Sequence, residues 1–309
     1  MSVEFAEPRI GREWNARGIG SFRDRAGFEA FAAAYREAMA EMGGPDWSGT
    51  VETAFGRVRV YRFDGGPGEP LLLPGRNASA PMWAANLPPL RRGRTVYALD
   101  GLGEPGCSAQ SAPIASAADQ AAWLDQTLEG LGLDAVHLLG VSIGGWLGVQ
   151  MLLHRPQRVL SLMALDPART FGELTPAVVL VSLGAVLPMP DRWRGRLVGL
   201  ISGGIDHSQE LAVGRLVAAG MKHFDVRLPP PVMPTGAELA AISTPVLVVI
   251  AGRSVIHRPG RAAARARAHL GEEAVELWPD ASHAISGEYP REIADRLDRF
   301  VAGAGRPGA

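Results

Sequence analysis

The chain contains a single cysteine, Cys107, among its 309 residues. One cysteine cannot form an intrachain disulfide, so a disulfide-stapled fold is excluded and a reducing compartment is expected. Lysine is equally rare, since Lys222 is the only one and arginine supplies almost all of the positive charge. The formal net charge is −1, so we expect neither a nucleic acid nor an anionic membrane as a partner.

Long hydrophobic runs are also missing. The longest apolar stretch, residues 177–187, has 11 residues, whereas a membrane-spanning helix needs about 20. The first residues, MSVEFAEPRIGREW, contain no apolar segment of the signal-peptide type. These absences predict a cytoplasmic protein.

Short apolar segments alternate with helical ones along most of the chain. Residues 51–63 resemble an antiparallel hairpin, and residues 22–42 carry the spacing of an amphipathic helix. Buried strands are predicted at 70–75, 95–100, 136–142, 159–166, 245–252 and 274–280. Helices are predicted at 117–131, 143–154, 261–269 and 288–301. This order predicts an α/β fold, with a mostly parallel sheet and helices on both faces.

One stretch interrupts the alternation. From Pro167 to Ile242 the pattern is helical without a buried strand, which is far longer than an ordinary connection. We interpret it as a helical cap over the sheet. The predicted division is an N-terminal helical extension at 1–50, a core at 51–166 and 243–309, and a cap at 167–242.

The segment LLGVSIGGW, residues 138–146, places Ser142 between a predicted strand and a predicted helix. Gly-x-Ser-x-Gly in that context is typical of a nucleophile elbow, because small neighbours permit the strained turn that exposes the serine oxygen. The alternative is a tight turn that merely contains a serine. In folds with this elbow the histidine base comes last in the chain, and His283 is the only histidine after the last predicted strand.

Three motifs resemble those of the α/β-hydrolase superfamily: GVSIGG at 140–145, DGLGEPGCS at 100–108 and SHAISGEYP at 282–290. The front half resembles bacterial carboxylesterases that carry an N-terminal helix before the hairpin. The resemblance implies the α/β-hydrolase fold with a helical cap. It also implies an oxyanion hole formed by the backbone N–H groups of Ile143 and Arg76, although Pro74 stands where the superfamily usually has a histidine.

A second departure concerns the catalytic acid. The superfamily usually places an acidic residue after the strand that ends here in AGRSVIHRPG, residues 251–260, and this stretch has no carboxylate. Asp166, at the end of the preceding predicted strand, occupies a position from which some members take their acid. The alternative is that Asp166 only caps the turn before Pro167. Asp100 and Glu288 match superfamily positions that are structural.

These motifs predict a serine hydrolase acting on a carboxylic ester or lactone, with Ser142, His283 and Asp166 as catalytic residues. No cofactor and no metal are expected, since no ligand spacing is present. The expected partner is a small-molecule apolar ester or a related substrate, and a homodimer is possible. The apolar residues 177–187 of the cap either pack onto the body of the protein or face the active site, where they would select a bulky hydrophobic acyl or alcohol group. The alternative function is non-hydrolytic: a cyclase or lyase of secondary metabolites, or a ligand-binding protein on the same fold.

Overall fold

The computed structural model describes residues 5, 7–66, 70–73, 79–92, 94–176, 178 and 211–304. Its helices are α1 Arg12–Ala16, α2 Arg25–Met42, α3 Leu87–Leu90, α4 Ala117–Gly130, α5 Ile143–His154, α8 Ala212–His223, α9 Gly236–Ala240, α10 Pro259–Leu270, α11 Ile285–Glu288 and α12 Pro290–Ala304, with 3₁₀ turns η1 Ala80–Trp83, η2 Pro156–Arg158 and η3 Glu272–Ala274. Its strands are β1 Ser21–Phe22, β2 Trp47–Thr53, β3 Gly56–Phe63, β4 Pro70–Leu73, β5 Val96–Leu99, β6 Ala109–Gln110, β7 Val136–Val141, β8 Val159–Leu165, β9 Phe224–Asp225, β10 Val246–Ala251 and β11 Val275–Trp278.

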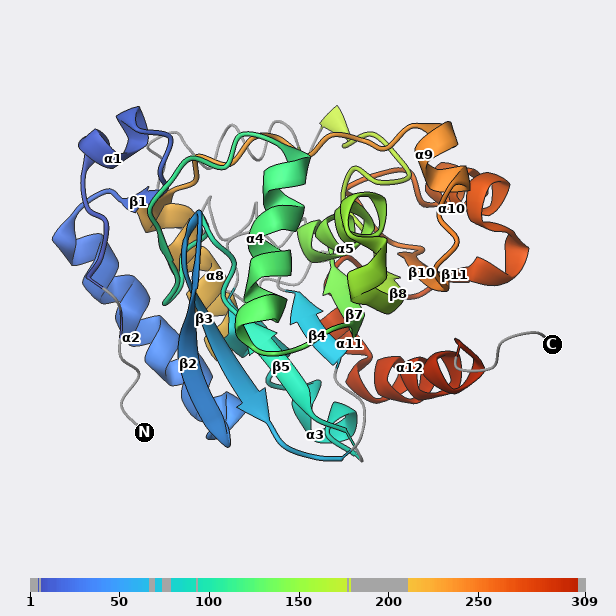
Figure 1. Cartoon of the computed structure of the whole chain (residues 1–309), viewed down its shortest axis with the longest axis horizontal. Helices are drawn as coiled ribbons and strands as arrows, with labels where there is room; N and C mark the ends of the chain where they lie inside the picture. The colour runs from blue at the N-terminus through green and yellow to red at the C-terminus, as the bar shows by residue number, and fades with distance from the viewer. Residues whose placement is uncertain are drawn as a thin grey trace.

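A single large sheet runs through the centre of the described residues in the order β11-β10-β8-β7-β4-β5-β3-β2 (Figure 1). The strands from β11 to β5 are parallel, and β3 and β2 close the sheet as an antiparallel hairpin. The parallel strands β7, β8 and β10 are apolar and buried along most of their length, as expected for strands covered on both faces. The predicted fold class is therefore the observed one.

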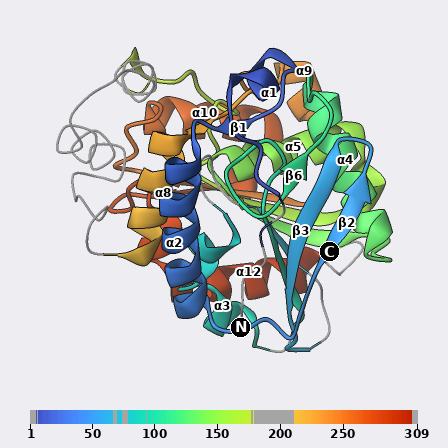
Figure 2. The ribbon, with the colours of Figure 1, turned by 90° about the vertical axis from the view of Figure 1, so that its left-hand side faces the viewer.

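Helices cover the sheet from both sides. On one face α4, α5 and α10 contribute buried residues to one hydrophobic cluster with the sheet, among them Leu124, Val149 and Ala263. On the other face α2, α8 and α12 pack into a second cluster that includes Phe31 and Leu297. The sheet thus lies between two helical layers (Figure 2).

The N-terminal segment contacts the chain that returns from the predicted cap. Strand β1 pairs antiparallel with β9, and α2 runs alongside α8 in both views (Figures 1 and 2). An ion pair of 2.9 Å joins Arg23 to Asp225 at this junction. The residues before the hairpin are therefore held against the described part of the predicted cap.

Several predicted boundaries differ from the observed ones. The amphipathic helix begins at Arg25 instead of residue 22, because the Asp24 side chain accepts the Gly27 N–H and caps it there. The last helix begins at Pro290 instead of residue 288, and a proline fits the first turn of a helix. Glu288 lies in the short helix α11, where its carboxylate accepts the N–H of Ser282 at 2.8 Å.

Candidate active site

The turn between β7 and α5 carries Ser142 in a strained backbone conformation, with φ 55° and ψ −117°. Positive φ is rare for a residue with a side chain and persists only where the surroundings enforce it. Here a Cβ on Gly140 would overlap the carbonyl group of Gly144, and one on Gly145 would lie 2.9 Å from Pro167. The small residues of the motif are therefore required by the close approach of strand, helix and neighbouring loop.

Backbone hydrogen bonds tie the Ser142 turn to the end of the next strand. The Ser142 N–H donates to the Leu165 carbonyl at 2.9 Å, and the Ser142 carbonyl accepts from Ala168 at 3.1 Å. Asp166 lies between these two anchors and itself has a positive φ of 41°. Ser142 and Asp166 are thus fixed relative to each other by main-chain contacts.

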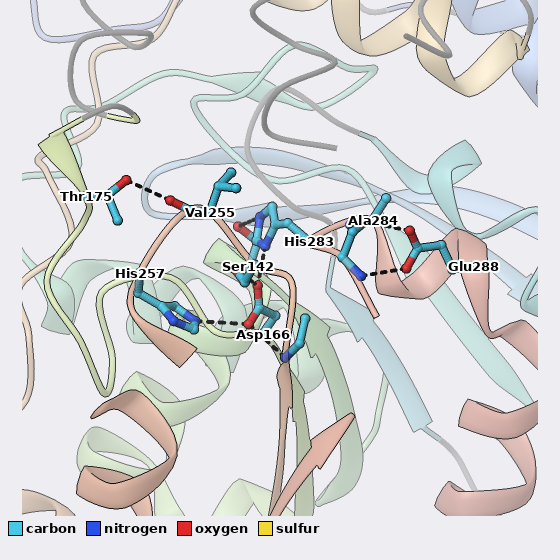
Figure 3. Close-up of polar contacts among 11 residues, drawn as sticks. Ser142, Asp166, Thr175, Val255, His257, His283, Ala284 and Glu288 are labelled. Atoms are coloured by element: carbon cyan, nitrogen blue, oxygen red, sulfur yellow. Dashed lines mark hydrogen bonds and ion pairs between the residues drawn. The ribbon is translucent and has the colours of Figure 1, made fainter. Parts of the chain in front are cut away.

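His283 joins the two residues from the loop that follows β11 (Figure 3). Its Nε2 lies 3.0 Å from Ser142 Oγ, and its Nδ1 lies 2.6 Å from Asp166 Oδ2. The three side chains form one continuous hydrogen-bonded row, although they are separated by up to 141 positions in the chain. The contact between Asp166 and His283 follows from the sheet order, since β8, β10 and β11 are adjacent and parallel.

Asp166 is completely buried, and donors surround its carboxylate. Oδ1 accepts the Ala251 N–H at 3.1 Å and lies 2.9 Å from His257 Nε2. Oδ2 accepts the Ser254 hydroxyl at 2.6 Å, in addition to His283. Burial raises the pKa of Asp166, but the contacts with His257 and His283 outweigh it and hold this pKa below its usual value.

Ile143, the predicted oxyanion donor, directly follows Ser142 in the chain. Ile143 is the first residue of α5, where N–H groups have no intrahelical acceptor and the helix dipole favours negative charge. Its partly buried side chain packs against Ala168, Val178 and Ile256. Pro74 and Arg76 lie outside the described residues, as do residues 177–187 with the exception of Val178.

The remaining sequence candidates have other partners. Asp100 is fully buried and accepts from the Tyr35 hydroxyl and from the N–H groups of Ala80 and Cys107, at 2.6–2.9 Å. Burial raises the pKa of Asp100 and that of the Cys107 thiol. These contacts join α2 to the loop after β5, and none of them reaches Ser142. His137 bonds Ser161 within the sheet.

Sequence reasoning missed Ser254 and His257. Both lie in the stretch 251–260, which has no carboxylate but contains these two side chains, each able to form hydrogen bonds. The available signal was the adjacency of β8 and β10, which places the loop after β10 beside Asp166.

Two further findings concern the described part of the chain. No helix there is long and apolar enough to cross a membrane. No three His, Cys, Asp or Glu side chains there are grouped as metal ligands.

The sheet order, the flanking helices and the strand–turn–helix of Ser142 define the α/β-hydrolase fold. A family model described as alpha/beta hydrolase fold matches residues 71–212. The chain is 28% identical over 263 residues to the carboxylesterase YbfK of Bacillus subtilis, covering 82% of this chain and 87% of that protein. It is 27% identical over 269 residues to the uncharacterized carboxylesterase nap of the same organism, covering 81% and 85%.

A solved structure agrees with this similarity. The crystal structure of the carboxylesterase CesB (YbfK) from Bacillus subtilis superimposes with a TM-score of 0.83 at 26% identity, over 90% of this chain and 99% of that one. The resemblance to bacterial carboxylesterases therefore extends over almost the whole chain.

Proposed function

We propose that the protein is a serine hydrolase that cleaves a carboxylic ester or lactone through an acyl-enzyme. The observation that carries the proposal is the unbroken row from Ser142 Oγ to His283 to Asp166, with contacts of 3.0 and 2.6 Å. The names of the similar proteins, carboxylesterases in both cases, support the same reaction class.

In the proposed reaction, Ser142 Oγ attacks the acyl carbonyl while His283 Nε2 takes its proton. The ionised Asp166 keeps the Nδ1–H tautomer of His283 and stabilises the imidazolium that forms. Negative charge on the carbonyl oxygen is held by the Ile143 N–H, together with that of Arg76. His283 then returns its proton to the departing alcohol oxygen.

Water completes the cycle. His283 removes a proton from a water molecule, which attacks the acyl-serine and releases the carboxylic acid, and the proton passes back to Ser142. The proposed substrate is a small, apolar ester. The apolar cluster of Ala168, Val178 and Ile256 supports the apolar character of the substrate, because Ile143, the residue next to Ser142, packs against it.

The test combines a suicide probe with two serine variants. Wild-type protein treated with a small fluorophosphonate should gain the mass of one adduct, and peptide mapping should locate it on Ser142. Ser142→Ala should lose the adduct and should reduce kcat for p-nitrophenyl esters by about 10⁶-fold. Ser48→Ala, which removes an exposed hydroxyl from β2, is the matched control and should change neither result.

The same experiment separates hydrolysis from the non-hydrolytic alternative. A cyclase, a lyase or a ligand-binding protein on the same fold does not depend on an activated serine. Folded wild-type protein that takes up no probe and turns over no ester would refute the proposed function.

A further inference from the structure

The loop after β10 places two buried side chains, Ser254 and His257, against the carboxylate of Asp166. Figure 3 shows the contact of His257. Ser254 is 7% exposed and donates its hydroxyl to Oδ2 at 2.6 Å. His257 is 2% exposed, and its Nε2 lies 2.9 Å from Oδ1. The segment that has no acid of its own is therefore in direct contact with an acid supplied by the neighbouring strand.

His257 has little other polar contact. Neither of its ring nitrogens makes an aligned hydrogen bond, and the polar group nearest to Nε2 is Asp166 Oδ1 at 2.9 Å. Burying a polar ring without partners is unfavourable, and a residue in such a setting calls for a specific role. Gly172 packs beside His257: a Cβ atom added to Gly172 would lie 3.4 Å from the Cβ atom of His257.

We propose that Ser254 and His257 are positioning residues that hold the Asp166 carboxylate in the orientation that His283 requires. This inference rests on the proposed function, in which Asp166 orients the base. The two residues act through Asp166 and do not touch the reacting atoms themselves.

The four contacts are shared equally between the two oxygens of the Asp166 carboxylate. Each oxygen faces two groups: Ala251 N–H and His257 on Oδ1, Ser254 and His283 on Oδ2. Without Ser254 and His257, one backbone N–H and one imidazole would remain to fix rotation about the Cβ–Cγ bond. A looser carboxylate gives a less well-oriented imidazole, and misplacement of a catalytic group reduces the rate of the chemical step.

The same contacts affect charge. Donors that stabilise a carboxylate reduce its basicity, so it attracts the proton on His283 less strongly. Among the described residues, the titratable side chains within ion-pair distance of Asp166 are His257 and His283, and Ser254 does not titrate in the accessible range. Removing Ser254 or His257 should therefore make His283 easier to protonate and move the acid limb of kcat/KM to higher pH.

The experiment compares Ser254→Ala, His257→Phe and His257→Gln with a control pair from the same sheet. His137 and Ser161 form a contact of 2.9 Å between β7 and β8, well separated in the sheet from the strand ends that carry the site, so His137→Phe and Ser161→Ala remove similar groups. The readouts are kcat and KM for a p-nitrophenyl ester over a pH series, and the NMR titration of the His283 imidazole, which requires no turnover.

We expect Ser254→Ala to lower kcat by about 10- to 100-fold, the cost of one hydrogen bond to a charged group, with KM almost unchanged. His257→Phe removes the ring nitrogen beside Oδ1 and should also lower kcat with KM almost unchanged. Both should shift the His283 titration and the acid limb to higher pH. His257→Gln, which restores a donor, should recover most of the rate, and the control pair should leave both profiles in place. Ser254→Ala and His257→Gln keep the test available if the phenylalanine variant does not fold.

Wild-type kcat and an unmoved His283 titration in Ser254→Ala and His257→Phe would overturn the inference. A loss of stability without any change in the pH profile would also overturn it, because that is what a merely structural role gives. Failure of the proposed function looks different: folded wild-type protein would take up no probe and turn over no ester, while the NMR titration would still report on the contact with Asp166.

Discussion

Replacing Asp166 with asparagine keeps the size of the side chain but changes one acceptor into a donor. Because the Ala251 N–H is a fixed backbone donor at 3.1 Å, the amide oxygen is held on the Oδ1 side. The NH₂ group then occupies the Oδ2 side, where it faces His283 Nδ1 at 2.6 Å. His283 accepts a hydrogen bond from this NH₂ group only if its Nδ1 carries no hydrogen. The neutral ring therefore takes the other tautomer, with its hydrogen on Nε2.

That tautomer is the wrong one for catalysis. With a hydrogen on Nε2, the ring donates to Ser142 Oγ across the 3.0 Å contact and cannot accept the serine proton. The imidazolium also loses its counter-charge. The same change in other serine-histidine-aspartate enzymes costs about 10⁴-fold in kcat, and we expect a loss of that size here, about 5 kcal/mol of transition-state stabilisation.

Steady-state hydrolysis of a p-nitrophenyl ester, with circular dichroism to establish that the variant is folded, measures this loss. Asp125→Asn is the matched control, since Asp125 is a partly buried carboxylate on α4 that binds Arg155 and Arg158 instead of a histidine. A folded Asp166→Asn enzyme with kcat within about tenfold of wild type would refute the tautomer argument and leave Asp166 as a turn residue.

Three further predictions follow from the site and its support. Gly140→Ala should abolish probe labelling, because its Cβ would overlap the Gly144 carbonyl group and displace the turn; intact mass after fluorophosphonate treatment measures this. Asp100→Asn should lower the free energy of unfolding in urea by about 1–3 kcal/mol. The groups that contact the Asp100 carboxylate are hydrogen-bond donors, and the new amide NH₂ group cannot accept from them. The acid limb of kcat/KM should follow a single proton, assigned to His283, because the pKa of Asp166 is held low enough that it stays ionised throughout that range.

Each of these has a control and a contrary result. Gly287→Ala adds a methyl group where no atom lies within 4 Å, so it should label normally, and a Gly140→Ala protein that labels at the wild-type rate would contradict the steric argument. Asp64→Asn changes an exposed acid and should leave stability unchanged, whereas an equally stable Asp100→Asn would show that the buried donors find other partners. If log kcat/KM rose with a slope of two on the acid side of the pH profile, two protons would be involved, and Asp166 would titrate together with His283.

The parallel sheet and its helices were predictable because their apolar segments are long and their order is regular. The helix predicted at 117–131, for instance, starts after Ser116, which forms a capping box with Asp119 in the structure. The observed α4 begins at Ala117 and ends at Gly130, within one residue of the prediction.

Elements held by distant partners were not predictable. Strand β1 has two residues, too few to show a period. It exists because β9, far along the chain, pairs with it, Ser21 with Asp225 and Phe22 with Phe224. The contact of α2 with α8 was unpredictable for the same reason. The sequence of each helix shows an apolar face but does not indicate which element covers that face.

The candidate site divides in the same way. Ser142 and His283 follow from motif and chain order, and Asp166 follows from the position of its strand end, so the sequence was enough to predict that they meet; their catalytic roles stay predictions. Ser254 and His257 were not predicted, because a serine and a histidine in a loop have no distinguishing pattern until the sheet order places them beside an acid. The oxyanion role of Arg76 and the cap boundaries also remain predictions.

The main-chain bonds between the Ser142 turn and the residues around Asp166 have a consequence for how the site is assembled. These two groups lie 24 positions apart on neighbouring strands, whereas His283 comes 117 positions after Asp166. A polypeptide ending before β10 would carry the serine and the acid but neither the Ala251 amide nor the imidazole. Two halves of the chain, produced separately, would therefore each be inert, and ester turnover on mixing them would report directly that β10 had docked beside β8.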